Sequence, residues 1–198
     1  MSLNPERVRH QIAQLHITNS LLAAQTVLLS NRLRDSLQQV SGCAELLSSL
    51  PEVSSNSRTG PFIKGILAAS RNIQSALGLV RRRAHRATRS VDAISHRVFQ
   101  GPETGIELLR WQLGHVQADN HELSCSAKEL APTIIKSIKQ ILSFAWFLAG
   151  SPVLAGNRPA LGLVKQVVTH AETMREMLED HQLGETPPIV AVASALPG

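Results

Sequence analysis

A run of apolar residues with heptad spacing is the feature that most restricts how this chain can fold. Eight apolar positions recur at alternating steps of four and three residues: Ile73, Leu77, Val80, Ala84, Ala87, Val91, Ile94 and Val98. Such steps keep side chains on one side of an α-helix and suit packing against another helix, whereas a strand alternates every second residue. The run therefore predicts a long, packed helix over residues 61–98.

Similar spacing continues on both sides of this helix. Asn4, Pro5 and Glu6 form a helix-start signal, because asparagine caps a first turn and proline and glutamate are favourable within it. Ala131 and Pro132 are expected to end or kink a later helix, since an internal proline removes a backbone hydrogen bond. We expect five helices, over residues 5–49, 61–98, 102–130, 132–149 and 159–182.

These elements predict an all-α fold. The chain of 198 residues is 43% hydrophobic and 18% charged, which suits one folded domain of ordinary size. The short link near residue 101 joins two long helices and favours an antiparallel hairpin. We predict a five-helix bundle with long antiparallel coiled-coil-like helices as a single domain over residues 1–184, followed by a flexible tail over residues 185–198.

The first helix carries a second apolar stripe, almost opposite its main seam. Ile17, Leu21, Ala24 and Leu28 form this stripe. Leaving large apolar residues in water forfeits about 1.5–3 kcal/mol each, so other helices or another chain should cover it. Ile17, Leu21 and Leu28 are therefore candidate partner-binding residues.

Two further pairs stand out within the expected helices. Trp146 and Phe147 belong to a chain with only 3% aromatic residues, so they are candidate partner contacts. Asn19 and Asn120 occupy seam positions, where a buried amide costs stability but sets helix register. The two asparagines either pair with each other or lie where water reaches them.

Positive charge is concentrated in the second long helix. Residues 58–97 contain nine Lys or Arg and one acid, in a chain whose net charge is +5. The predicted basic surface consists of Arg81, Arg82, His85, Arg86 and Arg89. Three readings stay open, namely a solvated helix face, a surface for an acidic protein, and a surface for nucleic acid or anionic lipid. The chain has no tyrosine, and no phenylalanine is interleaved with these arginines for base stacking.

Signatures of catalysis and of cofactor binding are not apparent. The sequence has no Gly-x-Ser-x-Gly elbow and no phosphate-binding glycine loop. His115, Asp119 and Glu122 share one helix face, which is too little for a metal site, and Cys125 one turn after His121 is a weak catalytic pair. We expect no enzyme activity, no metal, no cofactor and no small-molecule substrate.

The expected location is cytoplasmic or nuclear. The N-terminus lacks a conventional secretory signal, and the longest apolar run, residues 141–156, is too short and too interrupted by glycine and proline to cross a membrane. We therefore predict a non-catalytic interaction or scaffold module that associates, with itself or with another subunit, through apolar helix faces. Its basic face over residues 81–97 would meet an acidic partner. The alternatives are nucleic-acid or anionic-membrane binding through the arginines, and a membrane-active role for the amphipathic helix 132–149.

Overall fold

The computed structural model describes residues 4–98 and 105–183, without the side chains of 87–98, 126, 127, 129 and 181–183. Four long helices dominate it: α1 (Pro5–Ser49), α3 (Gly60–Val98), α4 (Ile106–Ala149) and α6 (Arg158–Leu183). Two single-turn helices, α2 (Pro51–Ser54) and α5 (Pro152–Ala155), lie in the connections between them. The described residues form helices and no strands, so the all-α prediction is confirmed.

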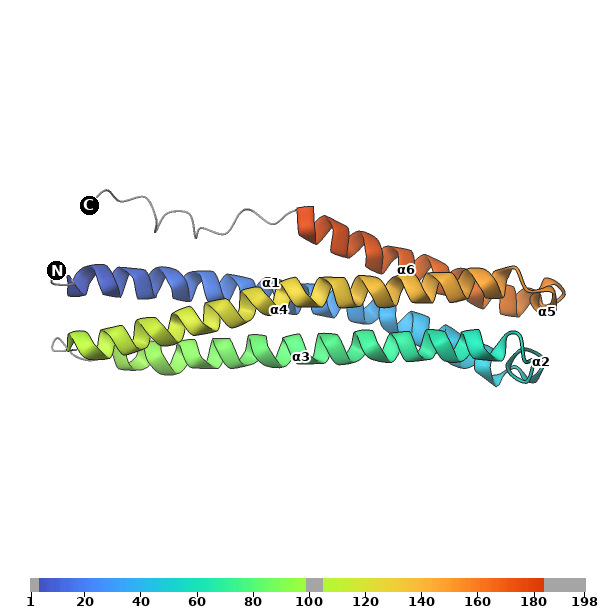
Figure 1. Ribbon diagram of the computed structural model, residues 1–198, viewed down its shortest axis with the longest axis horizontal. Coiled ribbons are helices and arrows are strands. Elements are labelled where there is room, and N and C mark those ends of the chain that lie inside the picture. Colours follow the sequence, from blue (N-terminus) through green and yellow to red (C-terminus); the bar gives the residue numbers. More distant parts are fainter. Residues whose placement is uncertain (1–3, 99–104, 184–198) are drawn as a thin grey trace.

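The long helices lie side by side in an elongated bundle and alternate in direction. In Figure 1, α1 and α4 run from left to right, and α3 and α6 return from right to left. Asn4 begins α1 by accepting a hydrogen bond from the Glu6 backbone N–H at 2.9 Å, which is the capping that the sequence predicts. The turns at the right-hand end contain α2 and α5.

The prediction of five helices was wrong at Pro132. Residues 132–149 continue the preceding helix. The combined α4 begins at Ile106 with Gly105 as its N-cap, and residues 102–104 of the predicted helix lie outside the described part of the chain. Pro132 has no backbone N–H to donate to the Lys128 carbonyl, and both residues are exposed at the surface of the helix. Ile134 and Ile138 on the next turns are fully buried, and their burial favours continuing the helix.

The main hydrophobic core fills the right-hand half of the bundle, where all four long helices meet. Its apolar side chains come from residues 33–47 of α1, 63–77 of α3, 134–148 of α4 and 160–178 of α6. Isoleucine, leucine and valine predominate, as a chain with few aromatic residues requires. This half holds most of the buried apolar side chains of the described residues.

The left-hand half of the bundle is built differently. Helix α6 has 26 residues against 45 in α1, so it reaches only about midway along α1 (Figure 1). Two small apolar clusters serve this half, one around Val8 and Leu109 and one around Ala23 and Ala84. Buried polar side chains, Asn19 and Gln112, lie among them. The candidate interaction surface lies along this thinner half.

Candidate interaction surfaces

The second stripe of α1 is exposed. We call Ile17, Leu21, Ala24 and Leu28 the apolar stripe. The exposed fractions of Ile17, Leu21 and Leu28 are 66%, 58% and 54%, and Ala24 is exposed as well. The opposite side of α1 is buried against α3 and α4 through residues such as Ile12 and Ala23. Within the described part of the chain, the apolar stripe therefore lacks the covering helix that its composition favours.

The same stretch of α1 is unusually free of charge. Residues 10–31 contain no Lys, Arg, Asp or Glu. Among the described residues, α1 is the one helix whose length and composition would allow it to cross a membrane, with an 18-residue stretch of mean hydropathy 1.2 that is 17% buried. Core helices and leader sequences have similar composition. This finding does not by itself place α1 in a membrane, and the absence of a membrane span stays a prediction.

A second exposed apolar surface lies at the other end of the bundle, near the end of α4. Trp146 and Phe147 are 64% and 63% exposed. The ring of Phe147 stacks on Phe62 of α3, with centroids 5.2 Å apart and planes 9° apart, and Phe62 also contacts Phe144 at 6.0 Å. The stacking favours this orientation of the Phe147 ring, although the residue is exposed.

Gly65 makes room for this aromatic group. A β-carbon at Gly65 would lie 2.5 Å from Cε2 of Phe144, closer than any normal contact. Trp146 and Phe147 stand out in the sequence as candidate contacts, whereas Phe62 and Phe144 do not. Their association depends on the packing of α3 against α4, which periodicity within one helix does not reveal.

The two seam asparagines meet in the thinner half of the bundle. The Asn120 side-chain Nδ2 donates to Oδ1 of Asn19 at 2.7 Å, and Nδ2 of Asn19 donates to the Val116 carbonyl at 3.1 Å. Asn19 is only 1% exposed. The sequence left open whether the two asparagines pair with each other or contact water, and in the structure they pair. Their role in setting the register of the helices stays a prediction.

Half-buried His16 adds to the polar interior of this half. Neither ring nitrogen of His16 has a hydrogen-bond partner among the described residues. Burial lowers the pKa of His16 below its ordinary value, because the charged imidazolium is poorly solvated there. The Asp119 carboxylate partly opposes this shift.

An ion pair with α4 lies next to the basic surface. Arg82, His85 and Arg86 are exposed, and Nε of Arg81 donates to Nε2 of His85 at 3.5 Å. The neighbouring Arg83 forms an ion pair with Glu122 of α4 at 3.5 Å.

A second acidic residue of α4 lies near these arginines. Asp119 is close to Arg83, Arg86 and Glu122 where α3 packs against α4. The side chain of Arg89 lies outside the described residues. The basic surface therefore has exposed cations on one side and acidic neighbours on the other.

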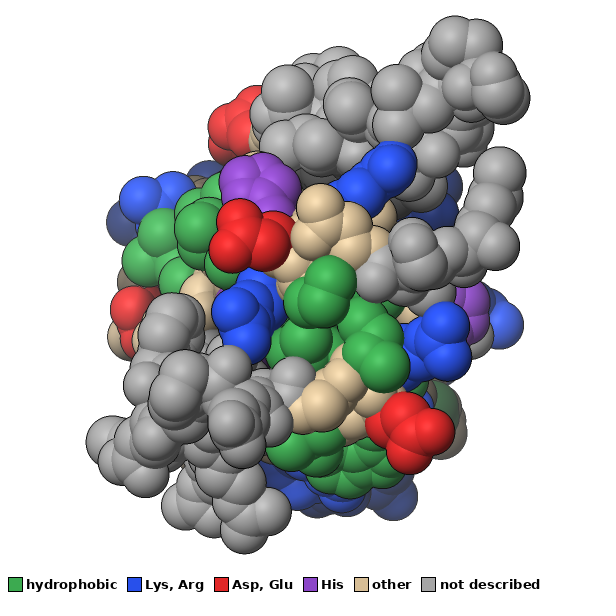
Figure 2. Space-filling view, turned by 90° about the vertical axis from the view of Figure 1, so that its left-hand side faces the viewer, with side chains coloured by type: hydrophobic (Ala, Val, Ile, Leu, Met, Phe, Trp, Pro, Cys, Tyr) green, Lys and Arg blue, Asp and Glu red, His purple; other side chains and the backbone are tan. Residues whose placement is uncertain are grey.

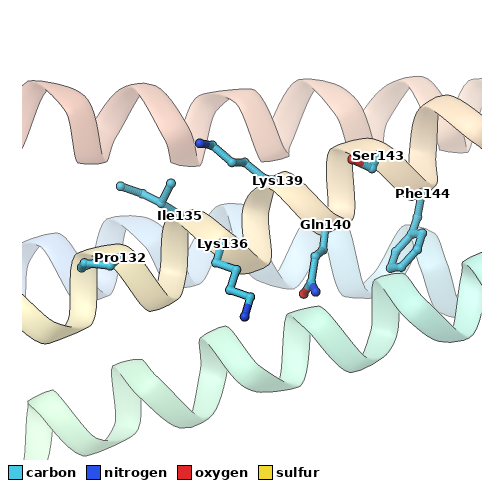
Figure 3. Close-up of a pocket in the computed structure, with 7 residues that line it drawn as sticks. All are labelled: Pro132, Ile135, Lys136, Lys139, Gln140, Ser143 and Phe144. Carbon is cyan, nitrogen blue, oxygen red and sulfur yellow. The ribbon is translucent and has the colours of Figure 1, made fainter.

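A hollow of about 640 Å³ opens on the outer face of α4. Its lining residues all come from that helix: Pro132, Ile135, Lys136, Lys139, Gln140, Ser143 and Phe144. Figure 3 shows Lys139 directed towards α6 and Lys136 directed towards α3. The two ammonium groups point away from each other, so they do not converge on one anion.

The two cysteines are free thiols in different surroundings. Cys43 is buried and donates to Oε1 of Gln166 at 3.2 Å, and burial raises the pKa of its thiol. Sγ of Cys125 lies 3.5 Å from Nε2 of His121 at the surface. In the described ranges, no three His, Cys, Asp or Glu side chains come together as metal ligands would.

The left-hand end of the bundle combines apolar and charged side chains. Viewed end-on, apolar side chains occupy the middle of this face, and several Lys and Arg side chains lie towards its rim (Figure 2). Leu108 and Trp111, in the first turns of α4, are 45% and 55% exposed.

Comparison of the sequence with models of known protein families and with curated proteins gave no match.

Proposed function

We propose that this chain is a non-catalytic protein–protein interaction module, in which a long coiled-coil-like bundle presents the apolar stripe to a protein partner. The observation that carries the proposal is the exposure of Ile17, Leu21 and Leu28 on a preformed helix, opposite the core. Complete burial of such side chains contributes about 1.5–3 kcal/mol each. Since more than half of each is exposed, a partner that covers them gains about 1–2 kcal/mol per side chain.

The continuous helical conformation of the segment that carries the apolar stripe supports this proposal. The apolar stripe lies within a continuous helix of 45 residues, so binding does not require that segment to fold first. Association then avoids the ordering cost of a flexible segment. The absence of charge between residues 10 and 31 also avoids the cost of burying an unpaired charge.

Site-specific photo-crosslinking tests the proposal in cells that produce the full chain. A photoreactive residue at Leu21 or Leu28 should form adducts that contain a polypeptide, identified by mass spectrometry. The same residue at Glu45, which is exposed on α1 outside the apolar stripe, is the matched control. Adducts with lipid alone, or equal labelling at Glu45, would overturn the proposal.

A pair of aspartate substitutions separates binding from folding. At dilutions where the protein is monomeric, Leu21→Asp with Leu28→Asp should leave the circular dichroism spectrum and the thermal transition nearly unchanged, because both side chains face solvent. The double variant should nevertheless lose its polypeptide adducts when the photoreactive residue is placed at Ile17. Ile12→Asp, which introduces a charge at a buried position, should unfold the protein and shows what a core defect looks like. Unfolding of the double variant would mean that the apolar stripe belongs to the core.

A second candidate function rests on the basic surface. Arg82 and Arg86 are exposed on α3, and arginine suits carboxylate and phosphate groups. We propose that an acidic protein partner meets this face, with nucleic acid or anionic lipid as the alternative ligands. Binding through these arginines should weaken steeply with salt and on Arg82→Gln with Arg86→Gln, whereas binding through the apolar stripe should not.

The membrane-active alternative for residues 132–149 requires a large rearrangement. Its apolar face, which includes Ile134, Ile138 and Ile141, is fully buried in the main core. That face would reach a lipid surface only if α4 left the bundle. Release of dye from anionic vesicles by the full chain would support this alternative.

A further inference from the structure

We propose that the partner of the apolar stripe is a second copy of this chain, and that the α1 helices of the two copies pack against each other in antiparallel orientation. In this register, a residue of one copy faces the residue of the other copy whose number brings the sum of the two to 45. This inference rests on the function proposed above and names the partner. The apolar stripe is part of a longer pattern of eight positions on α1. These positions, which we call the outer seam, are His10, Gln14, Ile17, Leu21, Ala24, Leu28, Asn31 and Asp35.

The outer seam has the geometry of a helix-pairing surface. Its positions are separated by alternating steps of four and three residues, the spacing that aligns side chains for packing against another helix. All eight residues are exposed. At about 1.5 Å per residue, the seam extends roughly 39 Å along α1.

The seam is complementary to itself when one copy is reversed. Four kinds of facing pair then form, each occurring twice across the two-fold axis: Ile17 with Leu28, Leu21 with Ala24, Gln14 with Asn31, and His10 with Asp35. The apolar pairs occupy the centre, and the large Leu21 faces the small Ala24. The polar pairs lie outside them, and Asp35 faces a residue that can donate a hydrogen bond or carry positive charge.

A parallel arrangement lacks these matches. It would place Asp35 against Asp35 of the second copy and His10 against His10, so that like groups face each other at both ends of the seam. It would also place Leu21 against Leu21 and Ala24 against Ala24, which alternates a crowded layer with a loose one. Charge and size therefore both favour the antiparallel register.

The structure leaves space for this pairing. The outer seam lies on the side of α1 opposite the buried residues Ile12, Asn19 and Ala23. Because α6 ends about midway along α1, the stretch that holds the apolar stripe lies beyond most of α6 (Figure 1). The other helices of the second copy would lie on the side of the paired α1 helices that faces away from the first copy.

Cysteine cross-linking tests the register directly. In a Cys125→Ser background, Ile17→Cys and Leu28→Cys are prepared as separate full-length variants; Cys43 stays, because it is buried and its raised pKa disfavours the reactive thiolate. Mild oxidation of an equimolar mixture should give at least tenfold more covalent dimer than either variant alone. In the antiparallel register, residue 17 of one copy lies about 16 Å along the helix axis from residue 17 of the other copy, which is too far for a disulfide. Efficient linking of Ile17→Cys with itself would overturn the register.

The mass of the purified protein tests self-association independently of the cysteines. Light scattering across a dilution series should show a reversible dimer of the 21.5 kDa chain. Leu21→Asp should weaken the dimer at least tenfold, whereas Leu79→Asp, which changes an exposed leucine on α3, should not.

The two proposals fail in different ways. A wild-type protein that is monomeric at every concentration would overturn self-association. If photo-crosslinking at Leu21 then captured a different polypeptide, the proposed function would stand and only the second copy would be rejected. If Leu21 gave no polypeptide adduct at all, both proposals would be rejected.

Discussion

The paired amides of Asn19 and Asn120 should be energetically coupled. Asn19→Ala removes the acceptor of the 2.7 Å bond and the donor of the 3.1 Å bond to Val116, and it leaves the Asn120 amide without that partner. Losing these bonds from a residue that is 1% exposed should destabilise the protein by about 2–4 kcal/mol. Asn120→Ala removes one bond at a half-buried position and should cost about 1–2 kcal/mol.

The double variant provides the decisive comparison. A stranded buried amide arises only when one partner is removed, so the two losses should not add. We expect the double variant to be more stable than the sum of the single effects implies, by about 1–2 kcal/mol. Urea denaturation followed by circular dichroism measures all three free energies of unfolding, at dilutions where the protein is monomeric. Asn72→Ala, at an exposed position of α3, is the control and should change stability by less than about 0.5 kcal/mol. Additivity within about 0.5 kcal/mol would refute the coupling.

Three further predictions concern stability. Gly65→Ala should destabilise the protein by up to about 2 kcal/mol, because the new methyl group meets the Phe144 ring. Gly162→Ala should stabilise α6 by up to about 1 kcal/mol, because no atom lies within 4 Å of its new methyl group. Thermal denaturation of both variants shows whether the two changes in stability have opposite signs. Lowering the pH below about 6.5 should destabilise the protein through His16, since its pKa is depressed in the folded state and the unfolded chain takes up the proton first. The free energy of unfolding of His16→Gln should therefore fall less between pH 7 and pH 5, and equal slopes would contradict this reasoning. Pro132→Ala should raise the stability of the protein by about 1–3 kcal/mol, since it restores a helical donor at an exposed position; a lower melting temperature would show that the proline is required for the packing of α4.

Local signals in the sequence account for most of the helix boundaries. The predicted ranges 5–49, 61–98 and 159–182 differ by at most one residue at each end from α1, α3 and α6, because caps and prolines at their starts act within one turn. Pro132 shows where a local rule fails. Its effect on the backbone is also local, but the residues that outweigh it are packed against three other helices.

The surfaces were harder to predict than the helices. Periodicity showed that α1 has two apolar sides, but which side is covered depends on where α6 ends and how the helices pack. The same limit applies to Phe62 and Phe144, which come together from different helices to support Phe147. Pattern within a helix identifies candidate contacts, and the arrangement of helices decides which of them remain exposed.

The early end of α6 has a consequence for how the molecule unfolds. The half with four helices holds the large apolar core, whereas the other half relies on two small clusters and polar side chains. Amide hydrogens in residues 8–28 of α1 should therefore exchange with solvent through local openings that leave residues 33–47 protected. A ligand that binds the apolar stripe would slow exchange in the first segment selectively, because binding stabilises the closed form. Occupancy of the stripe could then be read as a change in exchange along a single helix.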